Sequence, residues 1–127
     1  MKRKRVVFSL ITLFVIVYVA VGVWISHDTK IILVKAMSGA ADYKVYMNDK
    51  TYQNINPVTR DMTTIPYVYD KKYHKIGFVF PLHFFFISKA YVNQFYSKGD
   101  FGFREPVRLN LKLKSGKWYA TDVYIEP

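Results

Sequence analysis

The feature that most constrains this chain is an uncharged apolar run close to its N-terminus. Residues 6–25 read VVFSLITLFVIVYVAVGVWI and follow the basic sequence MKRKR directly. A helix needs about 20 such residues to cross the hydrocarbon core of a bilayer. The run therefore predicts a transmembrane signal-anchor helix. We expect it to meet lipid along its length, at Val6, Phe14, Tyr18, Trp24 and Ile25.

The residues that flank this run predict its orientation. Residues 1–5 form a basic stub, and basic residues next to a membrane span stay in the cytoplasm. Trp24 lies near the other end, where an amphipathic ring favours the membrane–water interface. We therefore expect a single-pass protein of the cell membrane, with its N-terminus cytoplasmic and the rest of the chain extracytoplasmic.

A cleaved signal peptide is the main alternative for this segment. Ala20-Val21-Gly22 is a weak small-x-small cleavage site, and cleavage there would release a secreted domain. The apolar run continues through the site to Ile25, and no polar spacer precedes the site. These features favour an uncleaved anchor.

A second apolar run, IGFVFPLHFFFI at residues 76–87, raises the question of a second membrane span. Twelve residues are too few to span a bilayer, and Lys75 and Lys89 limit any extension. Pro81 and His83 also fall inside the run. We interpret it as part of a domain core, with Pro81 ending a strand. The two-span alternative would return the C-terminus to the cytoplasm.

Local patterns predict mainly antiparallel hairpins. We expect one turning at Asn48-Asp49, a second over residues 65–80 with its tip at Asp70–His74, and a short connector or first strand at His27–Lys35. Residues 88–97 fit either a helix, with apolar residues at helical spacing, or a strand, and we favour the helix.

The clearest hairpin is the last one, VRLNLKLK-SG-KWYATDVYI. Leucines alternate with polar residues, and Ser115-Gly116 forms a two-residue turn that fixes the register. Lys114 should then face Lys117, and Asp122 should point to the apolar side opposite Leu109.

These elements predict a fold class and a domain division. We expect an N-terminal transmembrane helix followed by a small mainly-β or α+β domain of about five to seven strands and possibly one helix. The divisions are a cytoplasmic stub at 1–5, the anchor at 6–25, a connector at 26–41 and the extracytoplasmic domain at 42–127. The chain has no cysteine, so aromatic side chains rather than disulfides would have to hold this domain together.

No residue pattern predicts catalysis, a metal or a cofactor. The three histidines are not spaced as ligand pairs, and cysteine-ligated zinc is excluded by composition. The sequence contains no G-x-S-x-G nucleophile elbow. We therefore expect a protein that is not an enzyme and that needs no cofactor.

Positive charge is the strongest indication of a binding role. Beyond residue 5 there are fifteen basic and nine acidic residues, a net charge of +6. Two candidate partner-binding clusters combine lysine with tyrosine: Lys71, Lys72 and Lys75 with Tyr73, and Lys112, Lys114 and Lys117 with Tyr119.

Partners consistent with this charge are an anionic lipid, an anionic wall polymer or an acidic protein. The predicted topology places the domain on the wrong side of the membrane for nucleic acid. The lack of cysteine suits a bacterial envelope protein. The favoured function is a membrane-anchored binding or accessory protein, and the alternative is a small subunit of a larger membrane complex.

Overall fold

The computed structural model describes residues 2–60, 68–99 and 101–125 of the chain. Among these residues the predicted fold class is confirmed, because one long apolar helix precedes a small antiparallel sheet of five strands. The helices are α1 (Lys2–Ser38) and α2 (Asp49–Ile55), with short 3-10 helices η1 (Tyr43–Val45) and η2 (Lys71–Tyr73). The strands are β1 (His74–Ile76), β2 (Phe80–His83), β3 (Ile87–Lys98), β4 (Phe101–Lys114) and β5 (Lys117–Ile125).

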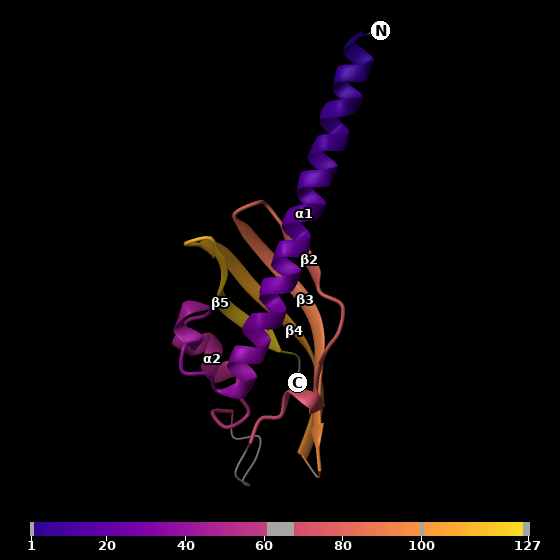
Figure 1. Cartoon of the computed structure of the whole chain (residues 1–127). Helices are drawn as coiled ribbons and strands as arrows, with labels where there is room; N and C mark the ends of the chain where they lie inside the picture. The colour runs from indigo at the N-terminus through magenta and orange to yellow at the C-terminus, as the bar shows by residue number, and fades with distance from the viewer. Residues whose placement is uncertain (1, 61–67, 100, 126–127) are drawn as a thin grey trace.

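The long helix α1 has two halves with different surroundings (Figure 1). Its first half extends away from the sheet, and the side chains of residues 6–17 are exposed. An 18-residue window of α1 has a mean hydropathy of 2.8 with none of it buried, so this helix is long and apolar enough to cross a membrane.

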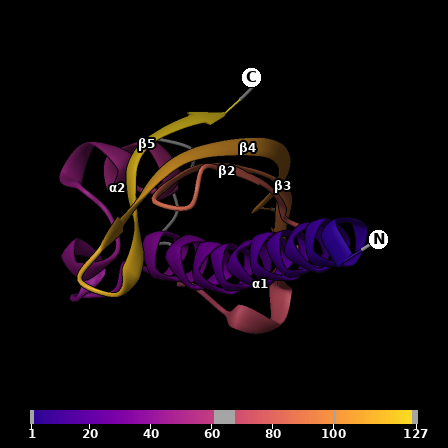
Figure 2. The ribbon, with the colours of Figure 1, turned by 90° about the horizontal axis from the view of Figure 1, so that it is seen from above.

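The second half of α1 lies along one face of the curved sheet, as the view from above shows (Figure 2). Its buried positions recur every three or four residues and so form one face of the helix. They are Gly22, Ile25, Thr29, Ile32, Leu33, Ala36 and Met37. The short connector or first strand predicted at His27–Lys35 is therefore wrong, because these residues continue α1 and supply its apolar side. Ile25, predicted to meet lipid, lies instead in the core of the domain.

Helix α2 replaces the hairpin predicted at Asn48-Asp49. The Asn48 side chain accepts a hydrogen bond from the Thr51 N–H at 2.9 Å and caps the helix. Its amide nitrogen donates to the Thr121 carbonyl of β5 at 2.8 Å. Asparagine favours both turns and helix N-caps. The Asn48-Asp49 pair therefore predicted that the chain changes direction, but not whether a turn or a helix begins there.

Strand β3 occupies the residues for which the sequence favours a helix, and that prediction is wrong. Every second residue is buried, as a strand requires: Ser88, Ala90, Val92, Gln94 and Tyr96. The strand has β4 on one side and both β1 and β2 on the other. Such a central position favours the β-branched and aromatic residues in which this segment is rich.

The second apolar run, residues 76–87, belongs to this sheet. It contains the last residue of β1, all of β2 and the first residue of β3. Residues 68–70 form no strand, residues 71–73 form η2, and β1 pairs with β3, so the described part of the hairpin predicted over residues 65–80 is wrong. The rest of that hairpin, residues 65–67, lies outside the described residues. Pro81 lies inside β2 rather than ending it, which an edge strand permits because proline donates no ladder bond.

The core joins α1 to β5 and to β2, which lie on opposite sides of the central strands β3 and β4. Trp118 at the start of β5 is fully buried, and its ring meets that of Trp24 edge-on at 5.8 Å. Its backbone N–H donates to the Asp28 carboxylate at 3.1 Å. On the other side, a Cβ added to Gly22 would lie 3.3 Å from Cγ of Pro81. The helix that contains the apolar run is therefore also a structural part of the domain.

Candidate binding face

The sheet has two chemically different faces. The face toward α1 is apolar and buried, whereas the outer face, on the side away from α1, is exposed and carries aromatic and basic side chains. Five large aromatic residues contribute to it, with exposed fractions of 82% for Phe78, 52% for Phe80 and Tyr124, and 37% for Tyr91 and Phe95. Large apolar side chains grouped on an exposed face mark interaction surfaces.

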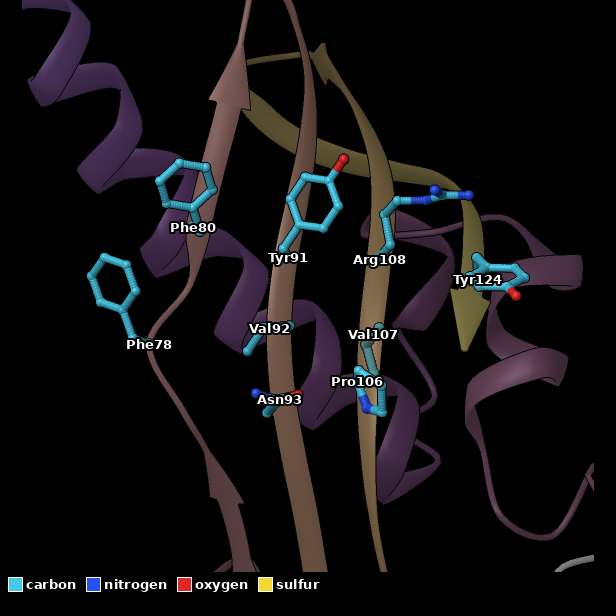
Figure 3. A pocket seen from close by; sticks show the side chains of 9 residues that line it. All are labelled: Phe78, Phe80, Tyr91, Val92, Asn93, Pro106, Val107, Arg108 and Tyr124. Carbon is cyan, nitrogen blue, oxygen red and sulfur yellow. The ribbon is translucent and has the colours of Figure 1, made fainter. Parts of the chain in front are cut away.

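These side chains surround a shallow hollow of about 400 Å³, which we call the aromatic groove (Figure 3). Phe78 and Phe80 lie on one side, Tyr91 in the middle, and Arg108 and Tyr124 on the other. Register explains the arrangement, because Phe80 pairs with Tyr91, Tyr91 with Arg108, and Arg108 with Tyr124 across four adjacent strands. The result is one row of large side chains across the sheet.

Basic groups lie over the rings of this face. The guanidinium carbon of Arg108 is 5.0 Å from the centre of the Tyr124 ring. Lys75 Nζ is 5.8 Å from the centre of the Phe95 ring. Cation–π contacts of this kind hold the basic groups beside apolar surface while leaving them available to an anion.

The two lysine–tyrosine clusters predicted from sequence do not meet. Lys75 pairs with Phe95 and Lys112 pairs with Ile87, at opposite ends of β3. At about 3.3 Å per residue the clusters are roughly 26 Å apart along the strand. Lys71, Lys72 and Tyr73, the other members of the first cluster, form η2, and Lys72 Nζ lies 5.7 Å from the Tyr73 ring centre.

The second cluster is only partly arranged around Tyr119. Lys112 and Lys114 lie 5.7 and 4.4 Å from the centre of that ring. Lys117 pairs with Lys114 across the turn, which confirms the predicted register there. Its ammonium group, however, lies 5.2 Å from the centre of the Tyr46 ring. The side chains of Lys114 and Lys117 thus contact different rings, those of Tyr119 and Tyr46.

A β-bulge changes the position predicted for Asp122. The ladder shifts between Asn110 and Leu111, so Asn110 pairs with Asp122 and Leu109 pairs with Val123. The extra residue reverses the side to which each later side chain points. Asp122 therefore lies on the outer face and not opposite Leu109, so that prediction is wrong.

Sequence reasoning missed Tyr91, Arg108 and Tyr124 as binding candidates. Arg108 stands at an outward position of the predicted last hairpin, whereas the predicted register places Tyr124 on the inward side, opposite Val107. Only the bulge brings Tyr124 opposite Arg108. Tyr91 falls within the segment for which the sequence favours a helix. The usable signal was the exposed period-two set in β3, which includes Tyr91 and Phe95.

Beneath the far end of the sheet lies a chain of buried polar side chains. Arg60 donates to both carboxylate oxygens of Glu105 at 2.9 and 2.8 Å, and Gln94 Nε2 donates to the same carboxylate at 3.0 Å. His74 Nε2 donates to Gln94 Oε1 at 3.0 Å, and the Tyr69 hydroxyl donates to His74 Nδ1 at 2.7 Å. Each donor thus has an acceptor, which suits a structural role.

Burial changes the acid–base properties of two members of this chain. It lowers the pKa of His74 below its usual value of 6.5, although the hydrogen bond to Gln94 opposes that effect. Burial also raises the pKa of Tyr69 to about 12. Both groups are therefore held neutral near pH 7.

Within the described ranges, no group of three or more histidine, aspartate or glutamate side chains could hold a metal ion. Comparison with known proteins adds no constraint, because no family model, curated protein or solved structure matches this chain.

Proposed function

We propose that this chain is a non-enzymatic, single-pass membrane protein whose outer sheet face binds an acidic segment of a partner protein outside the cytoplasm. The aromatic groove is the observation that carries the proposal. It combines exposed phenylalanine and tyrosine rings with Arg108, and such residues dominate the binding energy of protein interfaces.

The chemistry of the groove favours a protein segment over an anionic polymer. A wall polymer offers repeated charge and little apolar surface, and would match a continuous row of lysines. Here the two lysine clusters lie at opposite ends of β3, with aromatic side chains between them. Arg108 can hold a carboxylate through two parallel hydrogen bonds, while the neighbouring rings take apolar side chains.

Packing of α1 supports an uncleaved anchor. The candidate cleavage site at residues 20–22 lies within a continuous helix, and Gly22 is buried beside Pro81. Ile25, one turn further along, is fully buried in the core. Cleavage would remove the helix turn that contacts β2, which favours retention of the N-terminal segment.

Selection from a displayed random peptide library tests the proposal. The full chain is placed in lipid nanodiscs, so that α1 stays attached to the sheet. We expect the selected peptides to combine acidic residues with aromatic or aliphatic ones, and to lose affinity at high salt.

Two single substitutions then locate the binding surface. Arg108→Gln removes a charge from the groove, whereas Lys50→Gln removes the same charge from exposed α2. We expect only the first to weaken binding, by roughly tenfold or more for a desolvated arginine contact. Peptides without acidic residues, or equal losses for both variants, would contradict the proposal. Tighter binding of a polyphosphate probe than of any peptide would favour the polymer instead.

A further inference from the structure

The part of α1 that is exposed on all sides is shorter than a bilayer is thick, because from Tyr18 onward one side of the helix contacts the domain while Val19 and Val23 on the other side stay exposed. Side chains from Val6 to Val17 are exposed, whereas Tyr18 stacks on His83 with ring centres 3.8 Å apart. At 1.5 Å per residue, the uncovered stretch is about 18 Å long, against about 30 Å for the hydrocarbon core. When α1 crosses a membrane, the part of the domain beside Tyr18 must therefore reach hydrocarbon depth.

The turn between β2 and β3 is the part that lies there. The Phe85 ring is 5.8 Å from that of Phe14 and 6.1 Å from that of Tyr18. Its neighbours are exposed, by 76% at Phe84 and 71% at Phe86. We call this turn and its flanking residues the apolar tip: Leu82, Phe84, Phe85, Phe86 and Ile87.

Several polar groups of the tip are paired within the protein. The N–H of Phe84 donates to the Ile87 carbonyl, that of Phe85 to His83 Nδ1, and that of Phe86 to the Phe84 carbonyl. The Phe86 carbonyl accepts from Leu113, and His83 Nε2 donates to the Tyr18 carbonyl at 2.8 Å. Internal pairing of this kind lowers the cost of moving a turn out of water and into the membrane interface.

Phe85 adopts an unusual backbone conformation for its residue type. Its φ is 58°, in the left-handed region that favours glycine or asparagine. A glycine would relax the backbone but would remove the ring that touches Phe14 and Tyr18. Strained positions of this kind concentrate at functional sites.

Lysines stand directly behind the tip. Lys89 pairs with Leu82, and Lys112 pairs with Ile87. Each lysine therefore lies directly opposite an apolar residue of the tip on the neighbouring strand. Long basic side chains in such positions extend toward lipid headgroups. A hollow of about 600 Å³ lies here, lined by Tyr18, Leu82, Phe84, Lys89 and Lys112 among others. Its walls combine apolar surface for an acyl chain with charge for a phosphate.

We propose that the apolar tip is immersed in the leaflet on the domain's side of the membrane, with Lys89 and Lys112 among anionic phospholipid headgroups. The inference rests on the proposed anchoring by α1. It adds a second membrane contact, which fixes how deeply the sheet sits and which way the aromatic groove faces.

The absence of cysteine from the sequence allows a direct depth measurement. Nitroxide labels are placed singly on the full chain in nanodiscs, and accessibility to oxygen and to a water-soluble nickel complex is measured. Leu13→Cys reports on the anchor, Phe86→Cys and Phe84→Cys report on the tip, and Ser97→Cys reports on the far end of β3. All four positions are exposed, so these substitutions should not disturb folding.

We expect the labels at 13, 84 and 86 to be accessible to oxygen, and the label at 97 to the nickel complex. Labels at 84 and 86 in water, with the label at 13 in lipid, would overturn tip immersion and leave the anchor intact. A label at 13 in water would overturn the anchor itself. A label at 97 in lipid would show that the domain lies in another orientation.

Brominated lipids test the headgroup preference. A fluorophore at Phe86→Cys is quenched in mixed nanodiscs that contain either brominated anionic or brominated zwitterionic phospholipid. We expect the anionic lipid to quench several-fold more strongly, and the preference to disappear in a Lys89→Gln/Lys112→Gln background. Lys50→Gln/Lys44→Gln, which removes the same charge from exposed positions elsewhere, is the control. Equal quenching by both lipids in the parent chain would overturn the anionic preference.

Discussion

Replacing Arg60 with methionine should destabilise the domain strongly, because it leaves a buried carboxylate without its cation. Glu105 is 5% exposed and takes two hydrogen bonds from Arg60 and one from Gln94. Methionine keeps much of the arginine stem but removes all its donors. Of the contacts described for that carboxylate, only the one to Gln94 would remain.

The expected magnitude follows from the burial of the two partners. Breaking a buried ion pair by removing one partner costs about 3–5 kcal/mol. The Arg60 side chain is 18% exposed, so water can partly replace it, and we expect the lower end, about 3 kcal/mol. In the double variant Arg60→Met/Glu105→Gln the orphaned charge is gone, and the neutral amide oxygen introduced at position 105 can still accept from Gln94. The double variant should therefore lose less stability than Arg60→Met alone.

Urea unfolding of the full chain in detergent micelles, followed by tryptophan fluorescence, measures these differences. Arg104→Met is the matched control, since it removes an exposed arginine from the neighbouring position of β4 and should change stability by less than about 0.5 kcal/mol. The reasoning fails if Arg60→Met costs no more than this control. It also fails if the loss in the double variant equals the sum of the two single losses.

Three further substitutions or conditions test other parts of the fold. Burial lowers the pKa of His74, so the unfolded chain binds a proton more readily, and the free energy of unfolding should fall as pH drops through about 6.5. Urea unfolding at several pH values should show a weaker pH dependence of that free energy for His74→Gln. Gly22→Leu should cost about 1–3 kcal/mol by forcing α1 away from Pro81, whereas Ala20→Leu on the exposed side should cost little in the same melting assay. Asn48→Ala removes the cap of α2 and a bond to β5, so it should cost about 0.5–2 kcal/mol, and hydrogen exchange of the α2 amides should rise.

The elements that the sequence predicted well are those in which one period dominates. The apolar run of α1 and the alternation of the β4–β5 hairpin each admit only one regular structure. The prediction for β3 failed because its exposed and buried residues include aromatic side chains at both helical and strand spacings. Only its pairing with strands on both sides decides between them, and that pairing is not local information.

The candidate binding face lies at a different place from the two lysine–tyrosine clusters that the sequence indicated. Basic and tyrosine side chains do occupy the outer surface, yet the aromatic groove depends on Phe80, Tyr91 and Arg108 becoming neighbours across separate strands. A single inserted residue in β5 also decides on which side Asp122 stands. Such contacts depend on register, which composition and spacing could not supply.

The continuity of α1 from Lys2 to Ser38 has a consequence for how this protein can be handled by a cell. A domain on a flexible tether can be shed by a protease and can rotate freely above the bilayer. Here the exposed apolar turns of the helix run without a break into turns that fill the hydrophobic core. Proteolytic release of the domain by cutting within α1 would remove part of its core and unfold it. The tilt of this one helix also sets the orientation of the whole protein.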